Sequence, residues 1–254
     1  MSILNKQKVI ALLKAIETGA TAPIAYINSS KYIQHNLSVA DGLTGFVTLL
    51  QSLPPNSTKV NTIRVFEDGN YVFVHSEYNF FGPKIGFDIF RFEDGLIVEH
   101  WDNLQLTAKP NPSGHTMIDG STEIKDLDKT ETNKQIAKGF VANILMNADY
   151  STIENYISKD EYIQHNPSVG DGLQAFLSMQ LPKLKDGTLL KHTKLYHVLG
   201  EGNFVLTVSE AKTYTVDKAF YNLFRIENGK IVEHWDTIEA IPAKENWKNT
   251  NGKF

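Results

Sequence analysis

Two aspartates near the end of the first half of the chain are candidates for one shared site. Residues 87–92 and 96–102 alternate apolar and polar side chains and are joined by a short Glu-Asp-Gly turn, which predicts two paired antiparallel strands. In that pairing Asp88 and Asp102 meet across the ladder, with Phe90 beside them. Two carboxylates in a partly apolar hollow raise the pKa of at least one of them, which suits a carboxyl group for acid–base chemistry near neutral pH.

Other polar and aromatic side chains are candidates for the same hollow. The candidate catalytic residues are Asp88, Asp102, His35 and His75, and the candidate substrate-binding residues are Tyr32, Glu77, Phe90 and His100. Each polar candidate also has a plainer interpretation, as a solvated acid at a strand end or a histidine that caps backbone groups. No spacing resembles a zinc motif such as His-Glu-x-x-His, so we predict no metal and no cofactor.

The chain contains a long internal repeat. The block Tyr32–Val39 returns as Tyr162–Val169 with one difference, and Ile97–Asp102 returns unchanged as Ile231–Asp236. The offset is 130 residues at the first block and 134 at the second, so the second copy has gained a loop-sized insertion. A period of this length predicts a tandem duplication of whole domains, each with its own core.

The second copy carries a modified set of the candidate residues. Its pocket is predicted to contain Tyr162, His165, Asn222, His234 and Asp236. Asn222 stands where the first copy has Asp88, and Val208 stands where it has His75. We therefore expect the first copy to hold the fuller set of titratable groups.

The repeat and the composition predict the domain boundaries. We expect one domain over residues 1–110, a linker over 111–130 and a second domain over 131–254, because the linker lacks periodic apolar residues. Within it, Asn111–Met117 resembles Asn249–Phe254, each a polar glycine turn followed by one large apolar residue. Both segments are either frayed, or their apolar residues fill a hole on a neighbouring surface.

Each copy is predicted to begin with helices and to end with strands. Apolar residues recur at helical spacing in residues 9–16 and 136–145, and two shorter helices follow, the last closed by Pro54-Pro55 or by Pro182. Four runs with a period of two then alternate with hairpin-sized turns. This order predicts an α+β domain whose three N-terminal helices pack on one face of an antiparallel sheet.

Composition excludes several classes of protein. The 254 residues are 41% hydrophobic and 21% charged, as in globular proteins. A net charge of −4 without a basic run argues against a nucleic-acid partner. The absence of cysteine excludes disulfides and thiol catalysis. No apolar run has the length of a membrane span, and lysines interrupt the first apolar residues, unlike a signal peptide. We expect a soluble, cytoplasmic protein without a membrane partner.

Three motifs together resemble a known family. The Tyr-x-Gln-His-Asn block, the Asp-x-Phe-Arg strand and the closing Gly-x-Ile-Val-Glu-His-Trp-Asp are similar to the SnoaL-like, polyketide cyclase-like branch of the nuclear transport factor 2-like (NTF2-like) superfamily, twice over nearly the whole chain. The resemblance implies two cone-shaped domains, each a curved antiparallel sheet around helices with a pocket inside. It also implies that the convex faces form an intramolecular pseudo-dimer or a homodimer.

The resemblance also implies roles for particular residues. In polyketide cyclases of this branch an aspartate on the final strand is the acid–base group, and Asp102 and Asp236 hold the matching positions. The cyclase pattern has a histidine 14 residues earlier, where this chain has Asp88 and Asn222.

These observations predict a cofactor-independent enzyme that transfers protons next to a carbonyl group in a pocket of the first domain, as an aldol cyclase, isomerase or lyase does. Asp102 would be the general base, and Asp88 would donate a hydrogen bond to the developing enolate, with His35 or His75 assisting. The expected ligand is a small hydrophobic or carbonyl-containing molecule. The alternatives are a non-catalytic ligand-binding or carrier protein and a protein-interaction scaffold.

Overall fold

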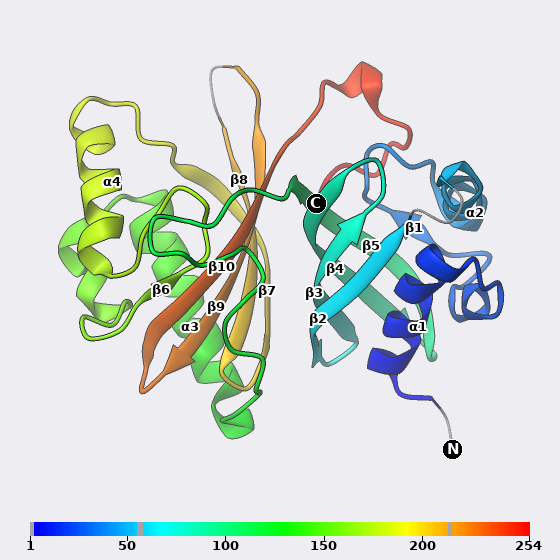
Figure 1. Cartoon of the computed structure of the whole chain (residues 1–254), viewed down its shortest axis with the longest axis horizontal. Helices are drawn as coiled ribbons and strands as arrows, with labels where there is room; N and C mark the ends of the chain where they lie inside the picture. Colours follow the sequence, from blue (N-terminus) through cyan, green and yellow to red (C-terminus); the bar gives the residue numbers. More distant parts are fainter. Residues whose placement is uncertain (1–2, 55–57, 213–214) are drawn as a thin grey trace. The chain divides into compact units, whose positions relative to one another are not determined.

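The computed structural model divides the chain into two compact units. It describes residues 3–54, 58–212 and 215–254. Unit 1 consists of Met1–Thr107 together with Ile241–Phe254, and unit 2 consists of Ala108–Ala240 (Figure 1). Each unit contains helices and one five-stranded sheet, so the chain has the predicted α+β architecture twice.

Unit 1 runs from helices into a strand meander. Its elements are α1 (Asn5–Thr18), the 3₁₀ helix η1 (Ala22–Tyr26), β1 (Ile33–Gln34), α2 (Gly42–Ser52), β2 (Lys59–Asp68), β3 (Tyr71–Asn79), β4 (Pro83–Glu93) and β5 (Leu96–Leu106). The strand order is β1-β5-β4-β3-β2. Strands β2 to β5 pair antiparallel, whereas the two-residue β1 pairs parallel with β5.

Unit 2 repeats this arrangement. Its elements are the 3₁₀ helix η2 (Leu127–Lys129), α3 (Thr130–Phe140), the π-helix η3 (Val141–Met146), the 3₁₀ helix η4 (Tyr150–Asn155), β6 (Ile163–Gln164), α4 (Leu173–Lys185), β7 (His192–Glu201), β8 (Phe204–Ala211), β9 (Lys218–Glu227) and β10 (Lys230–Ala240). The strand order β6-β10-β9-β8-β7 is that of unit 1. The structure therefore carries the sequence repeat through to the topology of the sheets.

The first helix of unit 1 forms as its apolar spacing predicts. Val9, Leu12 and Leu13 are buried on one face of α1, and the helix ends where Gly19 takes a left-handed conformation and its amide bonds the carbonyl of Ala15. This face packs with Val72 and other apolar side chains of the sheet into one core. An equivalent core in unit 2 joins α3 and α4 to β8, β9 and β10.

Three details differ from the sequence-based expectation. Pro182 lies inside α4, which continues to Lys185 instead of ending at the proline. The short parallel strands β1 and β6 were not expected, since two residues carry no detectable period. The last strand of unit 1 continues to Leu106, so Asp102 lies within a strand and not at its end. Of the predicted Pro54-Pro55 stop, Pro55 lies outside the described residues.

The segments that follow the two sheets attach to opposite units. Residues 108–126, the first tail, belong to unit 2, and Ile241–Phe254, the second tail (red in Figure 1), belong to unit 1. The Asn111 side chain in the first tail donates hydrogen bonds to the carbonyls of Gln164 and Val169. Asn249 in the second tail donates to the carbonyls of Asn36 and Val39. Both tails are therefore built into the units that they contact.

Two further observations concern the end of the polar turn in the first tail and the length of the helices. Met117, the apolar residue that ends the polar turn of the first tail, is 3% exposed, so its side chain is packed and not frayed. Among the residues that the structure describes, no helix is both long and apolar enough to cross a membrane.

Candidate functional site

The two aspartates predicted to meet are directly opposite each other in the sheet of unit 1. Asp88 on β4 pairs with Asp102 on β5 in the antiparallel register. Each is 5% exposed. They share the sheet face of the helix-packed core, because Val74, the partner of Asp88 on β3, belongs to that core. The tight Glu-Asp-Gly turn thus brings two carboxyl groups together away from bulk water.

Asp88 is held by two groups that can carry a proton. The hydroxyl of Tyr78 donates a hydrogen bond to Asp88 Oδ2 over 2.5 Å, and His100 Nε2 lies 3.0 Å from Asp88 Oδ1. Burial raises the pKa of Asp88, and the neighbouring Asp102 adds to that rise, although His100 and Tyr78 oppose it. Tyr78 was not among the residues that the sequence singled out.

A chain of hydrogen bonds fixes the orientation of His100. Its Nδ1 lies 3.0 Å from Gln34 Oε1, and this oxygen also accepts the backbone amide of Asn36. The Gln34 amide in turn donates to the hydroxyl of Tyr32 over 3.3 Å. Phe90 stacks on the His100 ring at 4.6 Å. Because Gln34 Oε1 is an acceptor, His100 Nδ1 carries a hydrogen.

Asp102 has different partners. The Asn36 side-chain amide donates to Asp102 Oδ2 over 2.5 Å. Asp102 Oδ1 forms an ion pair with Lys253 Nζ at 3.6 Å and has no hydrogen-bond partner among the described residues. Lys253 is 4% exposed and reaches the site from the second tail. Asn36 belongs to the repeated sequence block, whereas nothing in the sequence links Lys253 to Asp102 across 151 positions.

The structure does not bring His35 to the aspartates. His35 follows Gln34, which points toward His100, so alternation along the chain turns the histidine to the other side. There His35 stacks on Trp101 at 4.7 Å, its Nε2 bonds Glu99, and its Nδ1 donates to the carbonyl of Gly252 in the second tail. Its observed contacts hold the second tail on unit 1.

His75 and Glu77 also lie away from the aspartates. On β3 it is Val74 that pairs with Asp88, so His75 projects from the opposite face. His75 stacks on Phe87 at 4.3 Å and lies 3.1 Å from an Arg64 nitrogen. Glu77 is two residues further along β3 and therefore shares the face of His75. The expectation that these residues join one hollow was wrong about the face, because a one-residue change of register inverts it.

Unit 2 contains a corresponding pair of residues, in which an asparagine replaces one of the two aspartates. Asn222 on β9 pairs with Asp236 on β10, and His234 Nε2 lies 3.0 Å from the Asn222 amide oxygen. Burial lowers the pKa of His234 to about 3 and raises the pKa of Asp236 to about 6. The Asn166 amide donates to Asp236 Oδ2, as Asn36 does to Asp102. This site therefore has one titratable carboxyl, next to a neutral histidine.

The remaining predicted residues of unit 2 divide in the same way. Tyr162 is buried, and its hydroxyl accepts a hydrogen bond from the Gln164 amide. His165 stacks on Trp235 and bonds Glu233, so it lies apart from Asp236 just as His35 lies apart from Asp102. By register, Ala211 stands four residues after the partner of Asn222, where unit 1 has Tyr78. Unit 2 thus lacks both the second aspartate and the tyrosine that binds it.

The cluster in unit 1 also has the composition of a metal site. Ligand atoms of Asp88, His100 and Asp102 all lie within 4.8 Å of one another. The Lys253 ammonium, however, already brings a positive charge to Asp102. A second cation there would be repelled by that charge. The cluster therefore already has one cation beside its two carboxyl groups.

Comparisons with known proteins give similarities of fold. A scan against protein-family models and a search of curated proteins find no match. Among solved structures, a candidate polyketide cyclase from Streptomyces antibioticus is 14% identical, with 41% of this chain and 93% of that chain covered and a TM-score of 0.36. A candidate ketosteroid isomerase from Kribbella flavida is 15% identical, with 47% and 90% covered and a TM-score of 0.36.

A third similar structure is an NTF2-like protein of unknown function from Cytophaga hutchinsonii. It is 16% identical, with 41% of this chain and 93% of that chain covered and a TM-score of 0.36. The activities in these names belong to those proteins. Each of these matches covers between 41% and 47% of this chain.

Proposed function

We propose that the protein is a small-molecule enzyme that transfers protons next to a carbonyl group at the Asp88–Asp102 site of unit 1. The observation that carries this proposal is the buried pair of opposed carboxyl groups with His100 and Tyr78 bonded to one of them. The two acids have different partners, as an acid–base pair with divided roles requires. The reaction class is that of an aldol cyclase, isomerase or lyase.

Asp102 is the general base in this proposal. Its Oδ1 lies 3.6 Å from Lys253 Nζ but accepts no hydrogen bond among the described residues, so this oxygen is the one that would take a proton from carbon. The Asn36 amide donates to its other oxygen, Oδ2, and the Lys253 ammonium places a positive charge beside the carboxylate. The proton taken from the substrate moves to Oδ1, and the electron pair moves toward the carbonyl oxygen.

Asp88 and His100 stabilise the oxygen that becomes negative. Burial raises the pKa of Asp88, which suits its carboxyl group to donate a hydrogen bond to that oxygen, with His100 bonded to Asp88. The roles first assigned to His35 and His75 pass to His100 and Tyr78, because these two contact Asp88. The apolar side chains around the pair favour a hydrophobic carbonyl compound.

Deuterium exchange tests this proposal without knowledge of the natural substrate. Cyclohexanone and 1-tetralone in D₂O exchange the hydrogens next to their carbonyl groups when a base removes them, and proton NMR follows the loss of signal. We expect the protein to accelerate the exchange. Asp102→Asn should reduce the acceleration by about 10²–10⁴-fold, the usual contribution of a positioned acid–base group.

The matched control is Asp236→Asn, which makes the same change at the corresponding position of unit 2. It should leave the exchange rate within twofold of the unmodified protein, as an order-of-magnitude limit. Equal rates for the unmodified protein and Asp102→Asn would remove Asp102 from the mechanism. A rate reduced only by Asp236→Asn would assign the chemistry to unit 2.

A non-catalytic ligand carrier is the second candidate. It is favoured by the fact that three of the four carboxylate oxygens of Asp88 and Asp102 already accept hydrogen bonds within the protein. Such a protein would be stabilised against heat by a hydrophobic ketone, equally in the unmodified chain and in Asp102→Asn, with no deuterium exchange in either.

A further inference from the structure

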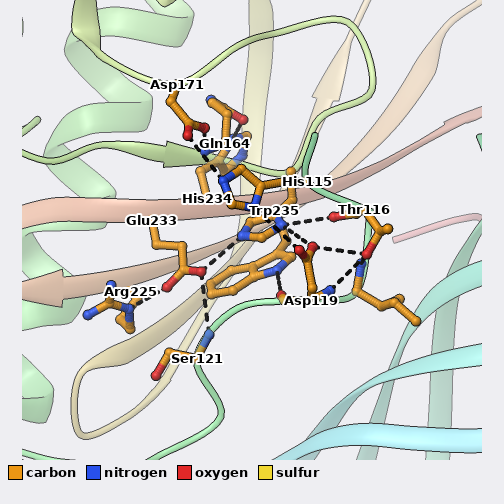
Figure 2. A network of polar contacts seen from close by, with 12 residues as sticks. His115, Thr116, Asp119, Ser121, Gln164, Asp171, Arg225, Glu233, His234 and Trp235 are labelled. Atoms are coloured by element: carbon orange, nitrogen blue, oxygen red, sulfur yellow. Dashed lines mark hydrogen bonds and ion pairs between the residues drawn. The ribbon is translucent and has the colours of Figure 1, made fainter. Parts of the chain in front are cut away.

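A second group of polar side chains lies on the other side of the unit 2 sheet from Asp236. His115 and Asp119 come from the first tail, and His165 follows β6. One ligand atom from each of the three lies within 4.8 Å of the others. Figure 2 shows His115 and Asp119 directed into a polar network that also includes Glu233. The acid–base proposal for unit 1 uses none of these residues.

In each imidazole ring, the nitrogen that points away from Asp119, which we call the outer nitrogen, lies against another carboxylate. His165 Nε2 lies 2.9 Å from Glu233 Oε1, and Glu233 is itself bonded by Arg225. His115 Nε2 lies 3.1 Å from Asp171 Oδ2. A carboxylate on the outer nitrogen of a histidine is the arrangement that commonly fixes a metal-binding ring and increases its basicity.

The Nδ1 nitrogens of both rings lie close to the Asp119 carboxylate. His165 Nδ1 lies 2.9 Å from Asp119 Oδ1, and His115 Nδ1 lies 3.3 Å from Asp119 Oδ2. These separations are close to the ligand–ligand distance of about 3.4 Å in a tetrahedral zinc site with bonds of about 2.1 Å. The carbonyl oxygen of Thr116, 2.8 Å from His165 Nδ1, is also within the group.

The charges around this group suit a cation. Thr116 and His115 bond the Asp119 carboxylate, and His165 and Arg225 bond the Glu233 carboxylate. Three carboxylates, including Asp171, therefore surround two imidazoles, with one guanidinium nearby. An oxygen atom faces the Nδ1 nitrogen of each ring, so each Nδ1 carries a hydrogen when no metal is bound.

We propose that His115 Nδ1, His165 Nδ1 and the Asp119 carboxylate form a binding site for a divalent transition-metal ion of the zinc class. Two imidazoles and one carboxylate are a typical ligand set for such ions. The ion takes the place of the two Nδ1 protons, which are released to solvent, so the charge of the network stays the same. Asp119 and His115 are partly exposed, with side chains 44% and 32% accessible, which leaves an entry path.

The site is a property of unit 2. His35 matches His165 in unit 1, but Lys253 takes the place of His115 after the glycine of the corresponding tail, and an ammonium cannot bind a metal. A bound ion would join the first tail to the segment after β6. We therefore expect the bound metal to stabilise the position of this tail within unit 2.

Zinc titration of the full, tag-free chain tests the proposal. After EDTA treatment and dialysis, we expect calorimetry to detect one tight Zn²⁺ per chain, with release of protons that depends on the ionisation heat of the buffer. Asp171→Asn, which acts through the outer nitrogen of His115, should weaken binding by about 10–100-fold. His115→Ala and Asp119→Ala should weaken it further, because each removes a ligand. Co²⁺ should give the visible absorption of a four- or five-coordinate site.

Two matched variants serve as controls. His197→Gln removes an imidazole from β7 of the same unit, and Asp88→Asn alters the other group of metal-ligating residues, so both should bind Zn²⁺ as the unmodified protein does. No detectable binding at about 100 μM Zn²⁺, a concentration on the order of the Kd of a weak surface site, would overturn the proposal. Unchanged binding in His115→Ala and Asp119→Ala would also overturn it. Neither outcome bears on the ketone exchange assigned to unit 1.

Discussion

At the scale of single residues, the two units differ in the groups that contact their buried aspartates. In unit 1, Tyr78 and His100 bond Asp88, and Asn36 and Lys253 contact Asp102. In unit 2, Asp236 accepts one hydrogen bond from Asn166, and its other oxygen has no hydrogen-bond partner among the described residues. A buried carboxylate with so little support is costly. Asp236 therefore holds its proton to a higher pH than an exposed aspartate.

This difference makes the stability of the protein depend on pH through Asp236. Below its ordinary pKa of 3.8 the residue is protonated in both the folded and the unfolded chain. Between pH 3.8 and the folded value of about 6 the unfolded chain ionises first, so the free energy of unfolding falls as pH rises. Above pH 6 the loss is complete, at about 3 kcal/mol for a shift of about two units.

Asp236→Asn should abolish that dependence. We expect urea unfolding at pH 4 and at pH 7.5 to show that the unmodified protein loses about 2.5 kcal/mol more than the variant between the two conditions, because the unfolded chain is already partly ionised at pH 4. Asp160→Asn, a change at an exposed acid of the same unit, should behave like the unmodified protein. Parallel pH profiles for Asp236→Asn and the unmodified protein would show that Asp236 does not retain a proton on folding.

The sequence allowed part of this site to be predicted. Asp88 and Asp102 could be paired because one short turn joins their strands and leaves few possible registers. His35 and His75 were placed on the wrong side because their distance along the chain from the aspartates leaves the register open. Lys253 could not have been predicted, because only the folded path of the second tail brings it to Asp102.

At the scale of elements, the most informative segments are the two tails, which have little regular structure. Asn249 donates to two backbone carbonyls of the segment that follows β1, and Asn111 does the same beside β6. The Gln164 carbonyl belongs to β6, and the other three acceptors lie in the segments that follow the two-residue strands β1 and β6. Periodicity predicted the long helices and strands well, but the tails carry no period, and their role became visible only through these hydrogen bonds.

Removing either asparagine should loosen one unit only. Asn249→Ala removes two hydrogen bonds to the carbonyls of Asn36 and Val39, at a cost of about 1 kcal/mol each, so amides in residues 33–41 should exchange hydrogen about 30-fold faster. Asn111→Ala should have the same effect on residues 163–171. Each variant is the control for the other, measured by hydrogen exchange with mass spectrometry. Faster exchange in both segments for either variant would contradict the separate roles of the tails.

At the scale of the whole molecule, the repeated domains in the sequence and the compact units in the structure have different boundaries. The repeat suggests a cut between residues 110 and 131, and the sheets follow that division. The compact units exchange their tails across it, so unit 1 contains residues from both ends of the chain. Sequence similarity between the copies detects common ancestry of elements and does not report which copy a tail contacts.

Two fragments should therefore fold to different extents. Residues 108–240 contain every segment of unit 2 and should give a cooperative thermal transition by circular dichroism. Residues 1–107 lack the second tail, and we expect a less stable fragment whose melting temperature rises when a synthetic peptide of residues 241–254 is added. A fragment 1–107 that melts at the same temperature with and without the peptide would show that the second tail contributes little to unit 1.

The exchanged tails also bear on the order in which the protein matures during translation. Ribosomes release the N-terminal portion of a chain first, and domains usually fold in that order. Here residues 241–254 are synthesised after all of residues 108–240, yet they complete the unit that begins the chain. Nascent unit 1 must therefore wait, with His35 and Asp102 lacking their last partners, while unit 2 already has its full sequence. Unit 1 is synthesised before unit 2 but acquires its complete set of contacts later.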